Sequence, residues 1–304
     1  MHRIDGLDTD STVAGGSEPS VSVLVVNYHA YDELEACLES LGRQCFGVEV
    51  IVVDQDTRES RRRIIEQRHR DVRWIPQTTN SGFAAGVNLA ARRASGSYLY
   101  LVNPDAVVAP DAAGVLAEWL KERPHVAVIG SMVLDPDGSI QGSARRFPGI
   151  STLFGGRTAW MTRRFPGNPL SRRNILTGAH VREPIEVDWV SGASMMIRRR
   201  AFDAVGGMDE RFFLYWEDAD LCKRLRDAGL ATVYHPGPSV THRCGGSGGG
   251  SPRSIVAFHR SAYRYFRKHG GALGLLASPL ALVALTLRLC VTLLATRVGP
   301  RVPN

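Results

Sequence analysis

The chain lacks the sequence marks of several large protein classes. No Gly-x-Gly-x-x-Gly follows its first apolar run, and Gly-x-x-x-x-Gly-Lys-Ser/Thr occurs nowhere, which argues against a dinucleotide-dependent dehydrogenase and a P-loop NTPase. Its five cysteines are scattered without Cys-x-x-Cys spacing, so we expect reduced thiols rather than a disulfide framework. Residues 1–19 hold no apolar run, which argues against a secretory signal and predicts a loose leader on a cytoplasmic protein.

The net charge of +7 is modest for 304 residues. Three kinds of partner could account for it: nucleic acid, an anionic membrane surface or a phosphorylated substrate. The arginines are spread along the chain, and no basic helix, zinc finger or aromatic RNA-binding signature accompanies them. Nucleic acid is therefore not an expected partner, and most single charges should be solvated.

Short β-branched runs alternate with helical patterns through the first half of the chain. VSVLVV and VEVIVV are typical of strands that are buried on both faces of a parallel sheet. The alternation predicts an α/β fold with right-handed crossovers. The expected strands are 21–26, 48–53, 73–76, 98–102 and 126–134, and the expected helices are 31–41, 59–69, 82–94 and 110–122.

The second half has a different character. Residues 143–184 are rich in Arg, Pro and Gly and predict a long, partly irregular excursion across the open end of the sheet, where loops are often functional. We expect a strand at 187–198, a glycine turn, a helix from Trp216 to Ala228 closed by Gly229, and a last strand at 231–235. The glycines of 244–251 predict a flexible loop.

Ligands of open parallel sheets bind beyond the carboxyl ends of the strands. The residues in that position are Asn27 and Tyr28, Asp54, Asn80, and the segment Asn103-Pro104-Asp105. Asp105 follows an apolar strand and could bind a divalent ion, because Mg²⁺ or Mn²⁺ often uses one or two carboxylates together with substrate phosphates. An ordinary Asn-Pro-Asp turn is the alternative interpretation.

The helix near residue 216 offers a candidate general base. Asp218 lies on the same stripe as Leu221, Cys222 and Leu225, so its carboxyl should point inward, and partial desolvation should raise its pKa. Glu217 and Asp220 should project to other faces, where acids favour a helix N-terminus. Helix capping is the alternative role for Asp218.

His242 precedes the glycine loop and is a candidate metal ligand tied to a segment that could close over a bound diphosphate. A lone histidine is usually a surface or core residue without a ligand role. We expect His235 to be such a residue.

On these motifs the sequence resembles the family 2 glycosyltransferases, and within them the bacterial rhamnosyltransferases that act on lipid-linked N-acetylglucosamine. The resemblance covers roughly residues 20–266. It is carried by VVNYHAYDELEACLESL, VIVVDQDT, NSGFAAGVN, YLVNPD, DPDGSIQGSARRFP, WVSGASMMIRRRAFDAVGGMDERFFLYWEDADLCKRL and VTH.

The resemblance implies a GT-A fold, a nucleotide-diphosphate sugar donor, a divalent metal (Mg²⁺ or Mn²⁺) and a single inverting displacement. NPD would replace the two-carboxylate motif of the family, so Asp105 would be the main acidic ligand, His242 a second ligand and Asp218 the base. The implied donor-binding residues are Asn27, Tyr28, Asp54, Asn80, Gly82, Asn88, Asn103 and Asp105. The implied acceptor-side residues are Trp189, Ser191, Gly192, Ala193 and Glu217. The best analogy for the donor is dTDP-rhamnose, with UDP-linked sugars close behind.

The C-terminal residues 267–304 predict an apolar helical tail outside a catalytic domain at 20–266. The run 280–296 carries Arg288 and falls short of the ~20 residues that span a bilayer. With the basic and aromatic HRSAYRYFRKHG before it, it predicts attachment to the inner face of the cell membrane. That location would suit a glycan or polyprenyl-diphosphate-linked acceptor; a helix packed on the domain is the alternative.

Two other functions fit parts of this pattern. A sugar nucleotidyltransferase would share the nucleotide-binding architecture, although the chain shows no glycine-rich basic first loop to handle a triphosphate. A noncatalytic sugar-nucleotide or membrane-binding module is disfavoured because Asp105, Asp218 and His242 are all present.

Overall fold

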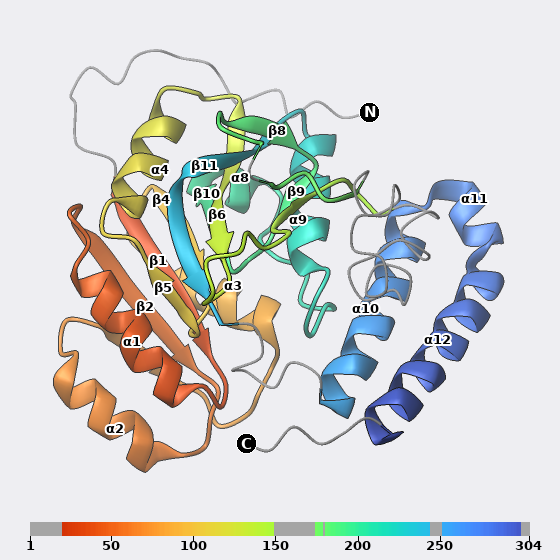
Figure 1. The fold of residues 1–304 in the computed structure, drawn as a ribbon, viewed down its shortest axis with the longest axis horizontal. Helices are drawn as coiled ribbons and strands as arrows, with labels where there is room; N and C mark the ends of the chain where they lie inside the picture. The colour runs from red at the N-terminus through yellow and green to blue at the C-terminus, as the bar shows by residue number, and fades with distance from the viewer. Residues whose placement is uncertain (1–19, 149–173, 179, 244–250, 299–304) are drawn as a thin grey trace.

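A computed structural model describes residues 20–148, 174–178, 180–243 and 251–298 (Figure 1). The predicted leader at 1–19, most of the excursion predicted at 143–184 and all but the last residue of the glycine loop predicted at 244–251 lie outside the described residues.

A nine-stranded sheet forms the centre of the molecule, in the order β3-β2-β1-β4-β10-β6-β11-β5, with β8 beside β11. β1, β2, β3 and β4 are parallel to one another, whereas β10 runs antiparallel between β4 and β6. The strands are β1 (Val21–Asn27), β2 (Val48–Asp54), β3 (Arg73–Pro76), β4 (Tyr98–Val102), β5 (Ala106–Val108), β6 (Val126–Leu134), β8 (Ile185–Val187), β10 (Ser194–Arg198) and β11 (Ala231–His242).

Helices cover both faces of the sheet, as the continuous apolar runs predict. On one face, leucines of α1 (Tyr31–Gly42) and α4 (Ala112–Lys121) form a buried cluster with Ile65 of α2 (Glu59–Arg68). On the other face, α3 (Phe83–Arg93), α8 (Arg199–Ala204) and α9 (Glu217–Asp227) pack against the sheet through a second cluster. The α/β architecture and the first four predicted strands are confirmed.

The single strand predicted at 187–198 is wrong. The segment divides into β8, β9 (Trp189–Val190) and β10, because residues 191–193 form a turn. β9 leaves the main sheet and pairs with β7 (Ala144–Arg145) in a small two-stranded sheet. The antiparallel β10 was not predicted, since an apolar run does not specify the direction of its neighbours.

The last strand is longer than predicted. β11 continues past residue 235 through a register shift at His235–Ser239, and its final residue His242 pairs with Ala106 of β5. Pro236 and Pro238 lack the N–H that a regular ladder requires, which explains the irregularity. The extension brings His242 beside the start of β5.

Three helices follow the sheet domain: α10 (Pro252–His269), α11 (Gly271–Leu276) and α12 (Ser278–Val298). Figure 1 shows them beside the domain, with α12 outermost. Aromatic contacts join α10 to the domain, with the ring of Trp216 lying 5.5 Å from Phe258 and 5.4 Å from Tyr265 between centroids. The boundary predicted between 266 and 267 falls inside α10.

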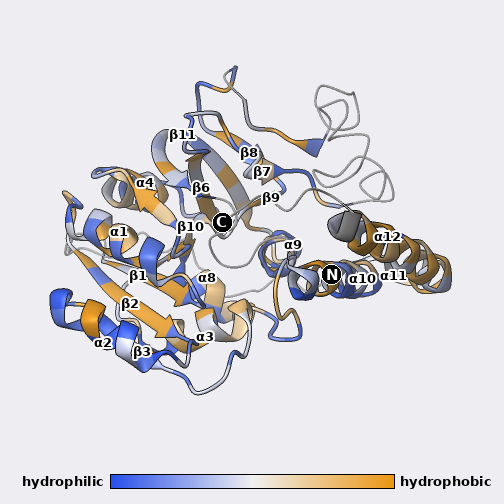
Figure 2. Ribbon diagram, turned by 60° about the horizontal axis from the view of Figure 1, so that its bottom comes forward, coloured by the Kyte–Doolittle hydropathy of each residue, from blue (hydrophilic) through white to orange (hydrophobic). Residues whose placement is uncertain are grey.

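The apolar tail forms a longer helix than its sequence run predicts. α12 has 21 residues, and Ser278–Thr296 is long and apolar enough to cross a membrane by length and composition. Its outer side chains remain exposed, among them Leu280 at 74%, Leu287 at 63% and Val291 at 67% (Figure 2). This apolar surface is not covered by other described parts of the chain, which is typical of a surface that contacts lipid.

Candidate functional site

Asn27 and Asp54 end two neighbouring parallel strands and lie opposite each other in the register of β1 and β2. Asn27 Nδ2 donates to Asp54 Oδ1 at 2.8 Å, and the Tyr31 hydroxyl donates to Asp54 Oδ2 at 2.7 Å. Burial and the hydrogen bond to Asp54 raise the pKa of Tyr31, which keeps the hydroxyl a donor. Asn27 and Asp54, which the resemblance implies line the nucleotide pocket, therefore hold the ends of β1 and β2 together. Their contact with the donor stays a prediction.

The turn after β1 meets the turn after β2. Tyr28 is half-buried and its ring stacks edge-on to His29, with centroids 4.2 Å apart. The buried Asp56 accepts the His29 N–H at 3.2 Å and is bound by Arg58 at 2.6 Å. Asp56 was not singled out in the sequence, although it stands two residues after the strand-end Asp54.

Gly82 begins α3 in a conformation that requires glycine, with φ +94°. A Cβ there would collide with Phe213, whose carbonyl accepts the Phe83 N–H at 2.8 Å. The Gly82 N–H donates to Asn80 Oδ1 at 2.9 Å and lies 3.2 Å from Gln55 Oε1. Asn80 and Gly82 thus shape the loop between β3 and α3 at the carboxyl edge.

Asn88 lies on α3 and faces the glycine turn rather than open space. Its side chain donates to the Met208 carbonyl and to Glu210, both at 2.9 Å, and accepts the Met208 N–H at 2.9 Å. Gly207, with φ +72°, leaves room for this amide, since a Cβ there would lie 2.7 Å from Asn88 Oδ1. The amide of Asn88 is therefore used by the turn, and its implied role near the nucleotide is not supported by these contacts.

Asp105 and His242 meet at the end of the sheet, although 137 residues separate them (242 − 105). His242 Nε2 lies 3.1 Å from Asp105 Oδ1 and 3.1 Å from Asn103 Nδ2. Asp105 is buried, and its Oδ1 atom has no hydrogen-bond donor. The sequence prediction that these residues act together is consistent with this geometry.

Gln141 fixes the orientation of the His242 ring. Its side-chain amide donates to the His242 carbonyl and to Asp135 Oδ1, both at 2.8 Å, which leaves Gln141 Oε1 to accept from His242 Nδ1 at 3.2 Å. The proton of the neutral imidazole therefore sits on Nδ1, and the Nε2 lone pair faces Asp105. Gln141 was missed in the sequence, because nothing local links it to a residue 101 positions away.

The donor set at Asp105 fits a divalent cation. Two ligands that each lie about 2.1 Å from one ion at a right angle are about 3 Å apart, and the Nε2 to Oδ1 distance is 3.1 Å. A buried carboxylate oxygen without a donor is the atom that a cation would satisfy. Among the described residues no group of three or more His, Cys, Asp or Glu could hold a metal, so an ion here would need further oxygen ligands from a substrate.

Glu217 and Asp218 form a pair of carboxyls at the start of α9. Asp218 is half-buried; its Oδ1 accepts the Ala219 N–H at 2.8 Å and its Oδ2 accepts the Gly192 N–H at 3.3 Å. Burial raises the pKa of Asp218. Burial and then the Asp218 charge raise the pKa of Glu217, whose Oε2 is buried without a partner.

Two placements predicted for this helix are wrong. Glu217 is 5% exposed and Asp220 is fully buried, whereas both were expected on outward faces. The reason is that α9 packs between the sheet and α10, so more than one face is covered. Burial alone would raise the pKa of Asp220, but hydrogen bonds from His269 and Lys268 and the Arg224 charge hold it below its usual range.

The turn 191–193 connects the two parts of the site. The Asn103 N–H donates to the Ala193 carbonyl at 3.3 Å, while the adjacent Gly192 N–H donates to Asp218 at 3.3 Å. Ser191 Oγ accepts the Ala193 N–H at 3.3 Å and stabilises the turn. Asn103, two residues before Asp105, and Asp218 are therefore both hydrogen-bonded to one short turn.

A tryptophan and an arginine lie next to this turn. Trp189 Nε1 donates to the Arg146 carbonyl at 2.9 Å, and the Arg145 guanidinium lies 5.1 Å from the Trp189 ring centroid. The Arg145 charge acts against the burial of Asp218 and lowers the pKa of that carboxyl. From the sequence, Arg145 was recognised only as part of the motif SARRFP, with no role of its own. Its place beside Asp218 follows from the pairing of β7 with β9.

Known proteins share both the sequence and the fold. The sequence profile of Glycosyl transferase family 2 matches residues 22–206, and that of the N-terminal domain of galactosyltransferase matches residues 173–243. The chain is 32% identical over 268 residues to N-acetylglucosaminyl-diphospho-decaprenol L-rhamnosyltransferase of Mycobacterium tuberculosis, covering 82% of this chain and 85% of that protein. It is 24% identical to Rhamnosyltransferase WbbL of Escherichia coli, covering 73% of this chain and 83% of that protein.

Solved structures show the same fold at low sequence identity. The mannosyltransferase PcManGT from Pyrobaculum calidifontis, in complex with GDP-Man and Mn²⁺, superposes with a TM-score of 0.57 at 18% identity, over 93% of this chain and 77% of that one. GalNAc-T7 with UDP, GalNAc and Mn²⁺ gives a TM-score of 0.58 at 16% identity, over 82% of this chain and 50% of that one. The matched profile covers more than half of the sequence, and the chain belongs to glycosyl transferase family 2, as a glycosyltransferase with the GT-A fold.

Proposed function

We propose that this protein transfers L-rhamnose from dTDP-rhamnose to a hydroxyl of an N-acetylglucosaminyl-diphospho-polyprenol, with a divalent cation and with inversion at the anomeric carbon. The observation that carries the proposal is the turn 191–193, which is hydrogen-bonded to Asp218 on one side and on the other to Asn103, the residue whose side chain contacts His242 of the Asp105–His242 pair. The printed name of the Mycobacterium tuberculosis relative supports the sugar and the acceptor.

Asp105 Oδ1 and His242 Nε2 are the protein ligands of the cation, and Mn²⁺ is present in two structural neighbours. A divalent cation held there would supply positive charge to stabilise the departing nucleotide diphosphate. Gln141 orients the imidazole so that Nε2 faces Asp105, and Asn103 Nδ2 lies 3.1 Å from the same atom. Asn27, Tyr28, Asp54, Asn80 and Gly82 surround the carboxyl edge where the nucleotide binds.

Asp218 is the general base. Its carboxylate takes the proton of the acceptor hydroxyl while the acceptor oxygen bonds to the anomeric carbon and the bond from that carbon to the phosphate oxygen breaks. Glu217 is the more buried of the two carboxyls and burial raises its pKa well above the ordinary value, so Glu217 keeps its proton more readily than Asp218 does. A single displacement of this kind inverts the anomeric centre and forms no covalent enzyme intermediate.

α12 anchors the protein at the inner face of the cell membrane, close to a lipid-linked acceptor. Its outward side chains are apolar along most of the helix (Figure 2), and burial of such side chains in hydrocarbon is favourable. The helix also packs against α10, which in turn contacts Trp216 next to the catalytic acids.

The proposal is tested by product analysis with the full-length protein in detergent. Incubation with dTDP-rhamnose, Mn²⁺ and a polyprenyl-diphosphate-linked N-acetylglucosamine should release dTDP and give an acceptor heavier by one deoxyhexose, with an anomeric configuration opposite to that of the donor by NMR. Release of pyrophosphate in a separate incubation with dTTP and a sugar 1-phosphate would instead indicate a nucleotidyltransferase. Transfer from UDP-sugars but not from dTDP-rhamnose would contradict the donor assignment.

A further inference from the structure

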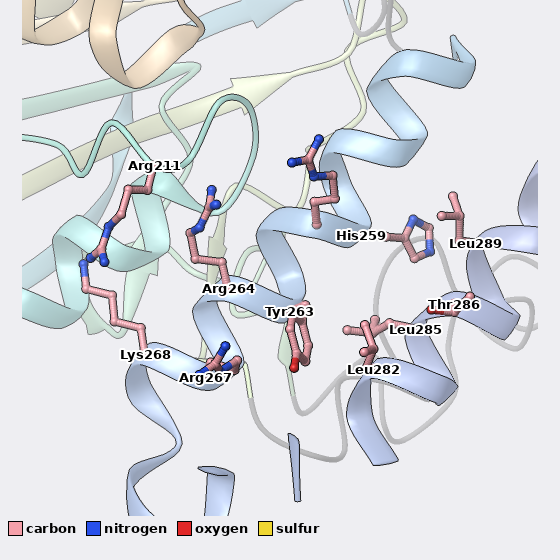
Figure 3. A pocket seen from close by; sticks show the side chains of 11 residues that line it. Arg211, His259, Tyr263, Arg264, Arg267, Lys268, Leu282, Leu285, Thr286 and Leu289 are labelled. Carbon is pink, nitrogen blue, oxygen red and sulfur yellow. The ribbon is translucent and has the colours of Figure 1, made fainter. Parts of the chain in front are cut away.

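A cleft separates α10 from α12 on the side of the domain that carries α9. It encloses about 530 Å³, which is within the usual size range of small-ligand sites. Figure 3 shows basic side chains of α10 and of the loop before α9 on one wall, and side chains of α12 on the other. The two walls differ sharply in chemistry.

The first wall is basic. Arg260, Arg264 and Arg267 project from α10 at spacings of four and three residues, and Arg211 and Lys268 complete the set. Aspartate and glutamate are missing from the lining, as far as the described residues go. Arg211 and Lys268 are paired with acidic residues of the domain, and the three arginines of α10 add positive charge that attracts an anion carrying more than one charge.

Two of these cations are already held in place by the domain. Lys268 Nζ lies 2.7 Å from Asp209 Oδ2, and Arg211 binds the same carboxylate at 2.6 Å. Arg264 lies 5.9 Å from the Phe212 ring centroid. Arg260 and Arg267 are exposed, and within the described chain neither makes an ion pair. The wall therefore combines two cations that the domain holds in place, Arg211 and Lys268, with two exposed guanidinium groups, those of Arg260 and Arg267, that can bind a ligand.

The second wall is apolar. Leu282, Leu285 and Leu289 face the cleft from α12 at spacings of three and four residues, which places them on one stripe of the helix. Leu282 is 47% exposed, so the stripe continues into the outer apolar surface of α12. A ligand that fits both walls has an anionic head and a hydrocarbon chain that leads toward the lipid phase.

The basic wall is connected directly to the catalytic helix. Lys268 Nζ lies 2.7 Å from Asp220 Oδ1, and His269 Nε2 contacts the same oxygen at 2.7 Å. Asp220 stands two residues after Asp218, in the same first turn of α9. The cleft therefore adjoins α9 through Asp220, whose side chain projects from a different face of the helix than that of Asp218.

We propose that this cleft binds the diphosphate group and the first isoprenoid units of the lipid-linked acceptor. The inference rests on the proposed function, because it identifies the place of the acceptor in the same site. A diphosphate matches this cluster of basic side chains better than the single charge of a phospholipid phosphodiester does, and the contact of Lys268 with Asp220 places the cleft next to α9, the helix that carries Asp218.

The test measures binding of farnesyl diphosphate, without any sugar donor, to the full-length protein in neutral detergent. Arg260→Glu and Arg267→Glu should each weaken binding about tenfold or more, since each removes a charge-assisted contact and adds repulsion. Arg253→Glu is the matched control, because Arg253 is an exposed arginine of α10 outside the cleft, and it should bind within about twofold of the unaltered protein. Equal binding by all of these proteins would overturn the inference.

Two further arms separate the possible outcomes. Phosphatidylglycerol in the micelles should compete poorly with farnesyl diphosphate; equal competition would make the cleft a general phospholipid site and overturn the inference. In the transfer assay, Arg260→Glu and Arg267→Glu should raise the KM for the lipid-linked acceptor and leave the KM for the donor unchanged. An unchanged KM for the lipid-linked acceptor in both variants would refute the role of the cleft in acceptor binding and leave the proposed function intact. Binding of farnesyl diphosphate that depends on the cleft, without any rhamnosyl transfer by the unaltered protein, would refute the proposed function alone.

Discussion

The backbone N–H of Gly192 donates to Oδ2 of Asp218 at 3.3 Å. This hydrogen bond attaches the catalytic helix α9 to the turn that precedes β10, and the next residue of that turn accepts the Asn103 N–H. The carboxyl proposed as the base is thus held from two sides, by Gly192 and by the Ala219 N–H. Such positioning is what general-base catalysis requires.

Replacing Asp218 with Asn preserves the shape of the side chain and removes the base. We expect kcat to fall by about 10²- to 10⁴-fold, the range for loss of a positioned general base. Binding of the donor should persist in calorimetry, because the Asp105–His242 pair is unaltered. Asp227→Asn on the same helix is the control and should keep full activity. Near-normal turnover of Asp218→Asn would remove the residue from the mechanism.

Glu217 gives the protein a specific pH dependence of stability. Its pKa is raised above the ordinary value of 4.5, so the folded state retains a proton that the unfolded state releases. The free energy of unfolding therefore falls as pH rises from 4.5 through the pKa that Glu217 has in the folded state. The amide in Glu217→Gln does not titrate. The Tm of this variant minus the Tm of the unaltered protein should therefore increase as pH is raised from 4.5 to 8. Parallel Tm curves for the two proteins would contradict the raised pKa.

Asp220 ties α10 to α9. Asp220→Asn leaves Lys268, His269 and Arg224 without their buried carboxylate, and loss of one partner from a buried pair costs about 3–5 kcal/mol. Thermal unfolding should reveal a clear drop in Tm. Asp227→Asn, which breaks the exposed pair with Lys223, should cost less than about 1 kcal/mol. Similar losses for the two variants would mean that the buried cluster has no special role.

Membrane attachment should depend on the outer face of α12. The double variant Leu287→Glu and Val291→Glu places two charges on its exposed apolar surface, and each charge in the hydrocarbon region costs about 2.5–3.5 kcal/mol. We expect the variant to stay with the soluble fraction when vesicles are floated on a density gradient. Ile64→Glu, at an exposed apolar residue of α2, should float like the unaltered protein. If the double variant also floats, α12 does not provide the attachment.

The strands that carry the nucleotide edge were predictable because their burial is a local property. Residues 21–26, 48–53 and 98–102 are apolar on both faces, and each observed strand contains them. The first polar residue after each run was therefore correctly placed at the carboxyl edge. The pairing of Asp105 with His242 was expected from the family resemblance, which implied that His242 is a second metal ligand beside Asp105.

The errors arise where one element packs against more than one neighbour. A helical stripe assigns a single buried face to α9, but α10 covers a second face and buries Asp220 with three basic side chains around it. The break between β9 and β10 depends on two hydrogen bonds with distant parts of the sequence: Asp218 accepts the Gly192 N–H, and the Asn103 N–H donates to the Ala193 carbonyl. The same holds for Gln141, whose contact with His242 is created by the extension of β11.

The most direct test of the account is a calorimetric titration of dTDP-rhamnose into the protein with Mn²⁺ and with a chelator. We predict that the unaltered protein binds the donor with Mn²⁺ and loses at least about tenfold in affinity with the chelator. Asp105→Ala and His242→Ala should bind weakly under both conditions, whereas His235→Ala, on the same strand but facing Trp119, should retain Mn²⁺-dependent binding. Two results would contradict the metal site. One is an affinity of Asp105→Ala for the donor that equals the affinity of the unaltered protein, and the other is a donor affinity that the chelator does not change in any of the proteins.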